Sequence, residues 1–224
     1  MAEDYFKRVR AQTPTQFFCD GPHIPWLKRA VEWGAVGVTS NPPRAARAVY
    51  LDTEFWEPEA DKILAAHPGM TDDDAVDMVT QAVVRRASEV LSPVFESTGG
   101  EKGYTGIQGN PRVYTDTDVL ISSARRYSKI SPNVAVKIPV HKEGLAAIEE
   151  LAAEGINIIP TTGYSVSQCL SAAEAHQKGI KRAQKRGANT KQSGVCLVTI
   201  VTGRLDAHLK EQIASNYFVF FACL

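Results

Sequence analysis

Short apolar runs rich in β-branched residues alternate along the chain with longer segments in which apolar side chains recur every three or four positions. The short runs predict strands and the longer segments predict helices, because the spacings match the periods of those two structures. Strands that alternate with helices are typical of βα units stacked around a parallel sheet. The predicted strands are residues 15–20, 35–41, 104–108, 134–139, 156–161 and 195–201.

Capping residues mark two of the predicted helix starts. Thr71 precedes the aspartates 72–74, which would face the positive end of a helix dipole. These acids could instead hold a metal ion, but adjacent acids diverge on a helix, so a helix start is the favoured interpretation. Ser165 and Gln168 form a predicted capping box. The helix that follows is predicted to pack through Val166, Cys169, Leu170 and Ala173.

Composition and charge exclude several classes of partner. The 224 residues are 44% hydrophobic and 22% charged, which is typical of a globular protein, and we expect residues 1–224 to form one domain. Because 25 basic side chains balance 25 acidic ones, we expect neither a nucleic acid nor a membrane partner. The basic segment 181–186 lacks interleaved aromatic residues, so it predicts a solvated helix end.

The cysteines and the first residues indicate where the protein works. Cys19, Cys169, Cys196 and Cys223 are far apart and form no CxxC pair, which argues against a structural zinc site. Three of them sit in apolar contexts, which favours reduced core thiols. The N-terminal residues lack the order of a signal peptide, and no apolar run approaches the roughly 18 residues of a membrane span. We therefore expect a cytoplasmic location and no metal.

Lys137 is a cation in the middle of the apolar strand predicted at 134–139. Burying an ammonium without a partner is unfavourable, so a buried lysine tends to lose its proton. The neutral amine is a nucleophile that can form an imine with a carbonyl group. An edge strand whose lysine points to water is the alternative that the sequence leaves open.

Polar side chains follow the ends of successive predicted strands. In a βα barrel these ends meet at one mouth, where the chemistry takes place. The residues are Asp20, Asn41, Gln108, Lys137, Thr161 and Arg204. Each has a structural explanation by itself, as a turn former, a satisfied core residue or a surface ion pair. Their equivalent positions favour a shared functional site.

Several segments match the motifs of one known family in order and spacing, namely residues 37–42, 103–112, 134–148 and 155–157. From about Tyr5 to about Glu211 the chain resembles transaldolases and the related fructose-6-phosphate aldolases. The resemblance implies a class I aldolase with a TIM (β/α)8 barrel. It also implies sugar-phosphate substrates, no cofactor, and a place in carbohydrate metabolism and the pentose phosphate pathway.

The resemblance also implies roles for the catalytic residues. Lys137 matches the Schiff-base lysine, which attacks the ketose carbonyl and holds a three-carbon dihydroxyacetone unit as an imine. Asp20 matches the acid/base aspartate at the C4 hydroxyl, and Thr161 matches a threonine that positions a catalytic water. The implied substrate contacts are Asn41 to the sugar, Thr199 in place of a serine, and Arg204 to the phosphate.

Three departures from the family pattern concern the reaction and the barrel. Gln108 stands where transaldolases have a glutamate, as in the aldolase branch, so an aldolase that releases dihydroxyacetone is an alternative. Ile159 occupies the place of a second sugar-binding asparagine. The tail after about Glu211 matches nothing in the family, so we expect about six βα units and an incomplete barrel. Such a chain would be weakly active, or a dead barrel that only binds sugar phosphate, unless copies assemble into a homo-oligomer.

Overall fold

Five parallel strands form the centre of the computed structural model, which describes residues 2–187, 193–203, 206 and 209–210. The strands pair in chain order: β1 (Cys19–Asp20), β2 (Gly37–Thr39), β3 (Tyr104–Ile107), β4 (Val134–Pro139) and β5 (Ile158–Thr161). Beyond β5, Ile158 and Gly163 form parallel bridges with Cys196 and Ile200. The sixth predicted strand is therefore present as a bridged segment.

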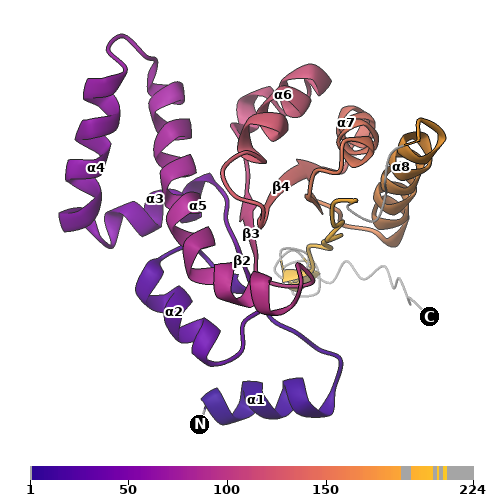
Figure 1. The fold of residues 1–224 in the computed structure, drawn as a ribbon, viewed down its shortest axis with the longest axis horizontal. Coiled ribbons are helices and arrows are strands. Elements are labelled where there is room, and N and C mark those ends of the chain that lie inside the picture. The colour runs from indigo at the N-terminus through magenta and orange to yellow at the C-terminus, as the bar shows by residue number, and fades with distance from the viewer. Residues whose placement is uncertain (1, 188–192, 204–205, 207–208, 211–224) are drawn as a thin grey trace.

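Helices follow the strands and lie outside the sheet (Figure 1). They are α1 (Ala2–Gln12), α2 (Ile24–Glu32), α3 (Pro42–Tyr50), α4 (Thr53–Ala66), α5 (Asp72–Ser97), α6 (Thr117–Tyr127), α7 (Lys142–Ala153) and α8 (Val166–Lys185), with a short 3-10 helix η1 (Pro111–Val113). Parallel strands in sequential order, each followed by an outer helix, are the arrangement of a TIM-type barrel. The described residues contribute the five strands and the bridged segment to that barrel.

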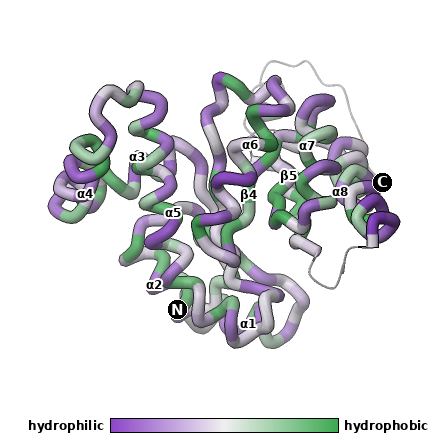
Figure 2. Tube along the Cα trace, turned by 45° about the horizontal axis from the view of Figure 1, so that its top comes forward, coloured by the Kyte–Doolittle hydropathy of each residue, from purple (hydrophilic) through white to green (hydrophobic). Residues whose placement is uncertain are grey.

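The two faces of the sheet carry different side chains. On β4, Val134, Val136 and Ile138 are buried in the large outer core with residues of α6, α7 and α8. Ala135 belongs instead to an inner cluster with Tyr104 and Ile159. Because side chains alternate along a strand, Lys137 lies on this inner face. Figure 2 shows that hydrophobic and hydrophilic stretches also alternate along the helices.

Both predicted helix caps are confirmed. The Thr71 hydroxyl accepts the Asp74 backbone N–H at 3.2 Å, and the Asp74 carboxylate accepts in return from the Thr71 backbone N–H. Ser165 and Gln168 form the same reciprocal box at the start of α8. In the described part of the chain, no group of three or more His, Cys, Asp and Glu side chains is arranged to hold a metal ion.

Two glycines allow close approach of the helices that follow β4 and β5. A Cβ atom on Gly144, in the first turn of α7, would lie 1.9 Å from the carbonyl oxygen of Pro139, the last residue of β4. A Cβ atom on Gly179 of α8 would lie 2.2 Å from the carbonyl oxygen of Glu149 in α7. Such contacts are impossible for a real Cβ, so glycine sets the separation at both places.

The predicted packing face of α8 is wrong for Val166 and Leu170. Val166 and Leu170 are 68% and 58% exposed, whereas the buried residues are Ala172, Ala175, His176, Gly179 and Ala183. The buried stripe consists mainly of small residues because α8 lies close against α7. Hydrophobicity alone selects the larger side chains and therefore a neighbouring face, on which Cys169 and Ala173 are only partly buried.

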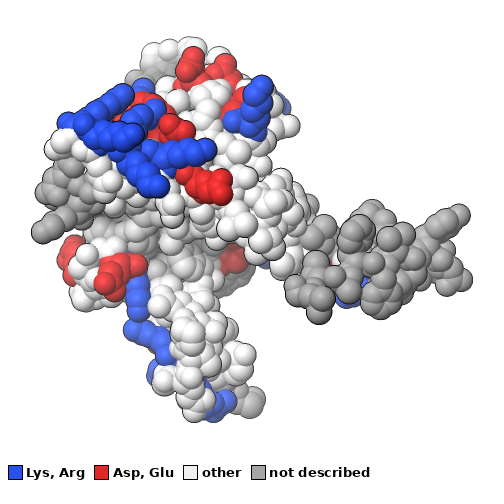
Figure 3. All heavy atoms as spheres, turned by 90° about the vertical axis from the view of Figure 1, so that its right-hand side faces the viewer, with Lys and Arg blue, Asp and Glu red and all other residues white. Residues whose placement is uncertain are grey.

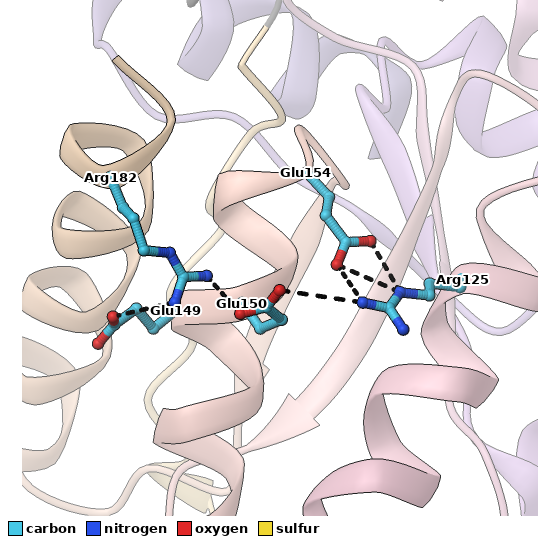
Figure 4. A network of polar contacts seen from close by, with 5 residues as sticks. All are labelled: Arg125, Glu149, Glu150, Glu154 and Arg182. Atoms are coloured by element: carbon cyan, nitrogen blue, oxygen red, sulfur yellow. Dashed lines mark hydrogen bonds and ion pairs between the residues drawn. The ribbon is translucent and has the colours of Figure 1, made fainter. Parts of the chain in front are cut away.

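Ion pairs tie the last helices together. Arg182 pairs with Glu149 at 3.5 Å and with Glu150, and Arg125 of α6 pairs with Glu154 and, at 3.9 Å, with Glu150 (Figure 4). On this side of the molecule, acidic and basic side chains are intermingled (Figure 3). The basic end of α8 is thus exposed at Lys181 and Lys185 as predicted, but Arg182 is a structural ion-pair partner.

Two further expectations concern cysteines and membranes. Cys19, Cys169 and Cys196 are free thiols, but they are only partly buried, and Cys223 lies outside the described residues. The description as core residues is therefore wrong for these three thiols. Among the described helices, none combines the length and hydrophobicity that crossing a bilayer requires.

Candidate active site

Lys137 lies at the centre of the site, on the inner face of β4. Its backbone is in register with Ile159 of β5, and its side chain is only partly exposed. Burial lowers the pKa of the Lys137 amine, the negative charge of Asp20 raises it, and the positive charge of Arg44 lowers it. In the described residues, nothing accepts a hydrogen bond from its Nζ atom. A larger share of this lysine is therefore unprotonated near neutral pH than of an exposed one.

Two cavities meet at this lysine. The inner cavity has a volume of about 510 Å³ and is lined by Phe18, Thr39, Lys137, Ile159, Thr161, Leu197, Val198, Thr199 and Val201. A smaller cavity of about 70 Å³ lies between the ends of β3 and β4 and helix α6, and includes Gln108 and Tyr127. Lys137 and Thr161 line both cavities. The amine is thus accessible to a small molecule in the barrel.

Asp20 ends β1 and is bound by an arginine. The Nη2 group of Arg44, in the first turn of α3, donates to Oδ2 of Asp20. The Asp20 side chain is 61% exposed, and no described residue hydrogen bonds its Oδ1 atom. Cys19 belongs to an outer cluster with α2 and α5, so the alternation places Asp20 on the inner face with Lys137. One carboxylate oxygen thus remains available for proton transfer.

Asn41 caps the helix that carries Arg44. Its Oδ1 atom accepts the backbone N–H of Arg44 at 2.9 Å, and Pro42 and Pro43 follow in the first turn of α3. Proline is favoured there because the first turn of a helix does not use its backbone N–H groups. The amide NH2 of Asn41 remains as the group that can donate to a ligand.

Three of the four other predicted residues line the cavities at Lys137. Gln108 lies one residue beyond the last paired residue of β3, next to Lys137, and shares the smaller cavity with it. Thr161 is 9% exposed at the end of β5. The Thr199 hydroxyl donates to the carbonyl oxygen of Pro160 at 2.7 Å, and the residue lines the inner cavity. Arg204 lies outside the described residues.

The sequence interpretation missed two residues at this mouth. Arg44 has no motif of its own, and only its fixed place in the first turn of α3 brings it to Asp20. Thr162 has φ of 57°, and its hydroxyl donates to the Thr161 carbonyl at 2.6 Å. A β-branched residue rarely adopts this left-handed conformation, and such strain is concentrated at functional sites. No sequence pattern signals either feature.

The arrangement brings together a nucleophile, a proton acceptor and hydroxyl groups. A partly buried amine can add to a carbonyl, a carboxylate on the same face can take a proton, and Thr161 and Thr199 can hold water or substrate hydroxyls. These are the groups needed for chemistry through an amine-bound carbonyl compound.

Comparison with known proteins agrees with this geometry. A family model described as "Transaldolase/Fructose-6-phosphate aldolase" matches residues 17–218. Transaldolase 1 of Streptomyces avermitilis is 34% identical over 182 residues, which cover 80% of this chain and 47% of that protein. Transaldolase 1 of Streptomyces coelicolor is 33% identical over 182 residues, with 80% and 46% covered.

A third relative, the transaldolase of Mycobacterium ulcerans, is 35% identical over 185 residues, with 80% of this chain and 48% of that protein covered. The chain spans about half the length of these relatives. The family match, by contrast, extends over most of the chain and includes β1 to β5 and the bridged segment. On this basis the chain belongs to the transaldolase/fructose-6-phosphate aldolase family.

Proposed function

We propose that this protein transfers a dihydroxyacetone unit between sugar phosphates through a Schiff base on Lys137. The observation that supports this most directly is the partly buried side chain of Lys137, which lines both the inner cavity and the smaller cavity. Its lowered pKa makes the free amine more abundant. Family membership adds the expectation of sugar-phosphate substrates.

The reaction begins with addition of the neutral amine to the ketose carbonyl. Loss of one water molecule then gives the imine. When the C3–C4 bond breaks, its electron pair moves into the protonated imine, which becomes an enamine. The C4 hydroxyl proton passes to Asp20, and an aldose phosphate leaves. Addition to an acceptor aldehyde reverses these steps, and hydrolysis of the imine frees Lys137.

Each remaining side chain has an assigned part in the proposal. Thr161, at the end of β5 beside Lys137, holds the water that is lost and regained. The Asn41 amide and the Thr199 hydroxyl contact the sugar, and Arg204 binds the phosphate through its planar pair of donors. Gln108 orients water or substrate without exchanging a proton. Pentose phosphate metabolism and a cytoplasmic location remain part of the prediction.

Borohydride trapping tests this function. The purified protein is incubated with fructose 6-phosphate, reduced and analysed by mass spectrometry. We expect a mass increase of one reduced dihydroxyacetone unit, located in the peptide that contains Lys137. The adduct should be absent from Lys137→Met and present in the matched variant Lys142→Met, whose side chain is exposed on α7. A folded wild-type protein that gives no adduct at any substrate concentration would refute the proposal and favour a binding-only barrel.

Gln108 favours a second candidate, an aldolase that releases dihydroxyacetone. A glutamine beside the lysine cannot share a proton with water as a carboxylate can, which distinguishes this site from the transferase pattern. The two candidates differ in their need for an acceptor. A transferase turns over only when an acceptor aldehyde is added, whereas an aldolase releases dihydroxyacetone from fructose 6-phosphate alone.

A further inference from the structure

The carboxylate proposed as the proton acceptor has a cationic partner of its own. Arg44 donates to Oδ2 of Asp20, and the two side chains are 38% and 61% exposed. Within the described residues, no other side chain or backbone group hydrogen bonds the Asp20 carboxylate. The orientation of this carboxylate therefore depends on one arginine.

The structure fixes the point from which Arg44 reaches Asp20. Asn41 caps α3 by accepting the Arg44 backbone N–H at 2.9 Å, so the arginine starts from the first turn of the helix. Its aliphatic stem lies along Gly21, and its Cδ atom is 3.8 Å from the position of a Cβ on that glycine. The guanidinium is thus held at the end of β1, where an unanchored arginine would sample many rotamers.

Asp20 and Arg44 act on Lys137 with opposite sign. The carboxylate favours the protonated amine, and the guanidinium favours the free amine. The other titratable side chains that line the cavities beside Lys137 are Tyr114 and Tyr127, and neither contributes to the pKa shift of the Lys137 amine. In the described residues, the charge balance at the amine is therefore set by this one pair.

We propose that Arg44 is a positioning residue of this site, which holds the Asp20 carboxylate at the barrel mouth and offsets its field at Lys137. The inference deepens the proposed function and rests on it, because it assigns Arg44 to the same imine chemistry. It explains how one site keeps a carboxylate for proton transfer near an amine that must be unprotonated to react. Without the arginine, the carboxylate would stabilise the ammonium form.

The sign of the expected pH effect follows from this balance. Loss of the guanidinium raises the pKa of Lys137, so the fraction of free amine falls at every pH below that pKa. At higher pH the amine is free in both proteins, and the difference disappears. We expect Arg44→Gln to lower the reactivity of Lys137 near neutral pH on the order of three- to tenfold. Arg44→Lys keeps the charge and should restore most of this loss.

Competitive labelling measures Lys137 without any substrate. The full chain is treated with limiting acetic anhydride over a range of pH, and mass spectrometry compares acetylation of Lys137 with that of exposed Lys142 in the same molecule. Arg44→Gln should move the Lys137 profile to higher pH, and Arg44→Lys should lie near wild type. The matched control Arg47→Gln removes an exposed arginine one turn further along α3 and should leave the profile unchanged.

Repeating the Arg44→Gln comparison in an Asp20→Asn protein separates the electrostatic role of Arg44 from a structural one. In Asp20→Asn the guanidinium loses the carboxylate that holds it at the end of β1, so Arg44→Gln should change the Lys137 profile less than it does in the wild-type protein. An equal effect in both backgrounds, or an unchanged profile in folded Arg44→Gln, would overturn the inference. A raised KM for phosphorylated sugars with an unchanged Lys137 profile would also overturn it, because Arg44 would then be a substrate ligand. Since labelling needs no turnover, it is independent of the borohydride result that tests the proposed function.

Discussion

Replacing Gly179 with alanine has two opposite effects on stability, a gain in helix propensity and a loss through a steric clash with α7. Alanine is favoured over glycine inside a helix by about 1 kcal/mol, so propensity alone predicts a more stable protein. The new Cβ would lie 2.2 Å from the Glu149 carbonyl oxygen, 2.8 Å from Ala152 Cβ and 3.0 Å from the Ala153 nitrogen. Two of these atoms belong to the α7 backbone, so the clash cannot be relieved by a side-chain rotation. Helix α8 must move away from α7.

We expect the clash to outweigh the propensity. Overpacking of this kind costs about 1–3 kcal/mol, which leaves a net loss of up to about 2 kcal/mol in the free energy of unfolding. For a chain of this size, the upper value corresponds to a fall in Tm of roughly 4–8 °C. Separating the helices would also weaken the pairs of Arg182 with Glu149 and Glu150.

Circular dichroism during thermal and urea unfolding gives both quantities. The matched variant Lys178→Ala, at the preceding exposed position, should unfold within about 0.5 kcal/mol of wild type. A Gly179→Ala protein as stable as wild type, or stabilised by about 1 kcal/mol, would show that propensity dominates and refute the close-packing argument.

Three further predictions concern polar groups. Burial lowers the pKa of His176, although a hydrogen bond with the Gly194 backbone raises it, so the unfolded chain binds the extra proton more readily. The free energy of unfolding should therefore fall as pH drops below about 6.5. Urea unfolding of wild type and His176→Gln between about pH 7 and 5.5 measures this fall, and identical pH slopes of the two proteins would contradict the prediction. Tyr127→Phe removes the hydroxyl that donates to Asp77 and should cost about 1–2 kcal/mol in urea unfolding, whereas exposed Tyr50→Phe should cost nothing measurable. Arg182→Met should cost at most about 1 kcal/mol at low salt, and a loss that persists undiminished in high salt would point to packing instead of charge.

The order of strands was predictable because each strand is a distinct apolar run. The bounds of β4 agree with the prediction, and both capping boxes follow from short, local rules. Helix α6 was not predicted, although Leu120, Ala124 and Tyr127 recur at helical spacing within Thr117–Tyr127. The packing face of α8 depends on how near α7 lies, and a distance between two helices leaves no trace in the hydrophobicity of one of them.

The candidate site likewise contains residues with a local signal in the sequence and residues placed only by tertiary contacts. Lys137 was predictable because a charge within an apolar strand is conspicuous in the sequence. The side chains of Thr161 and Thr199 do line the inner cavity with it; the strand position suggested Thr161, and the family resemblance suggested Thr199. Arg44 was not predictable, because its contact with Asp20 joins residues 24 positions apart through the path of α3. Pairing between a helix start and a strand end is a tertiary contact, which local periodicity does not encode.

The contact between Gly144 and Pro139 limits which residues position 144 can hold without moving the end of β4. Any side chain at position 144 would push against the carbonyl oxygen of Pro139, two residues after Lys137. A substitution in the first turn of α7 would therefore displace the backbone that aims the amine, although Gly144 lines neither cavity at Lys137. Under the proposed function, selection therefore also acts on a glycine outside both cavities, and a library randomised at position 144 should yield active clones that encode glycine almost exclusively.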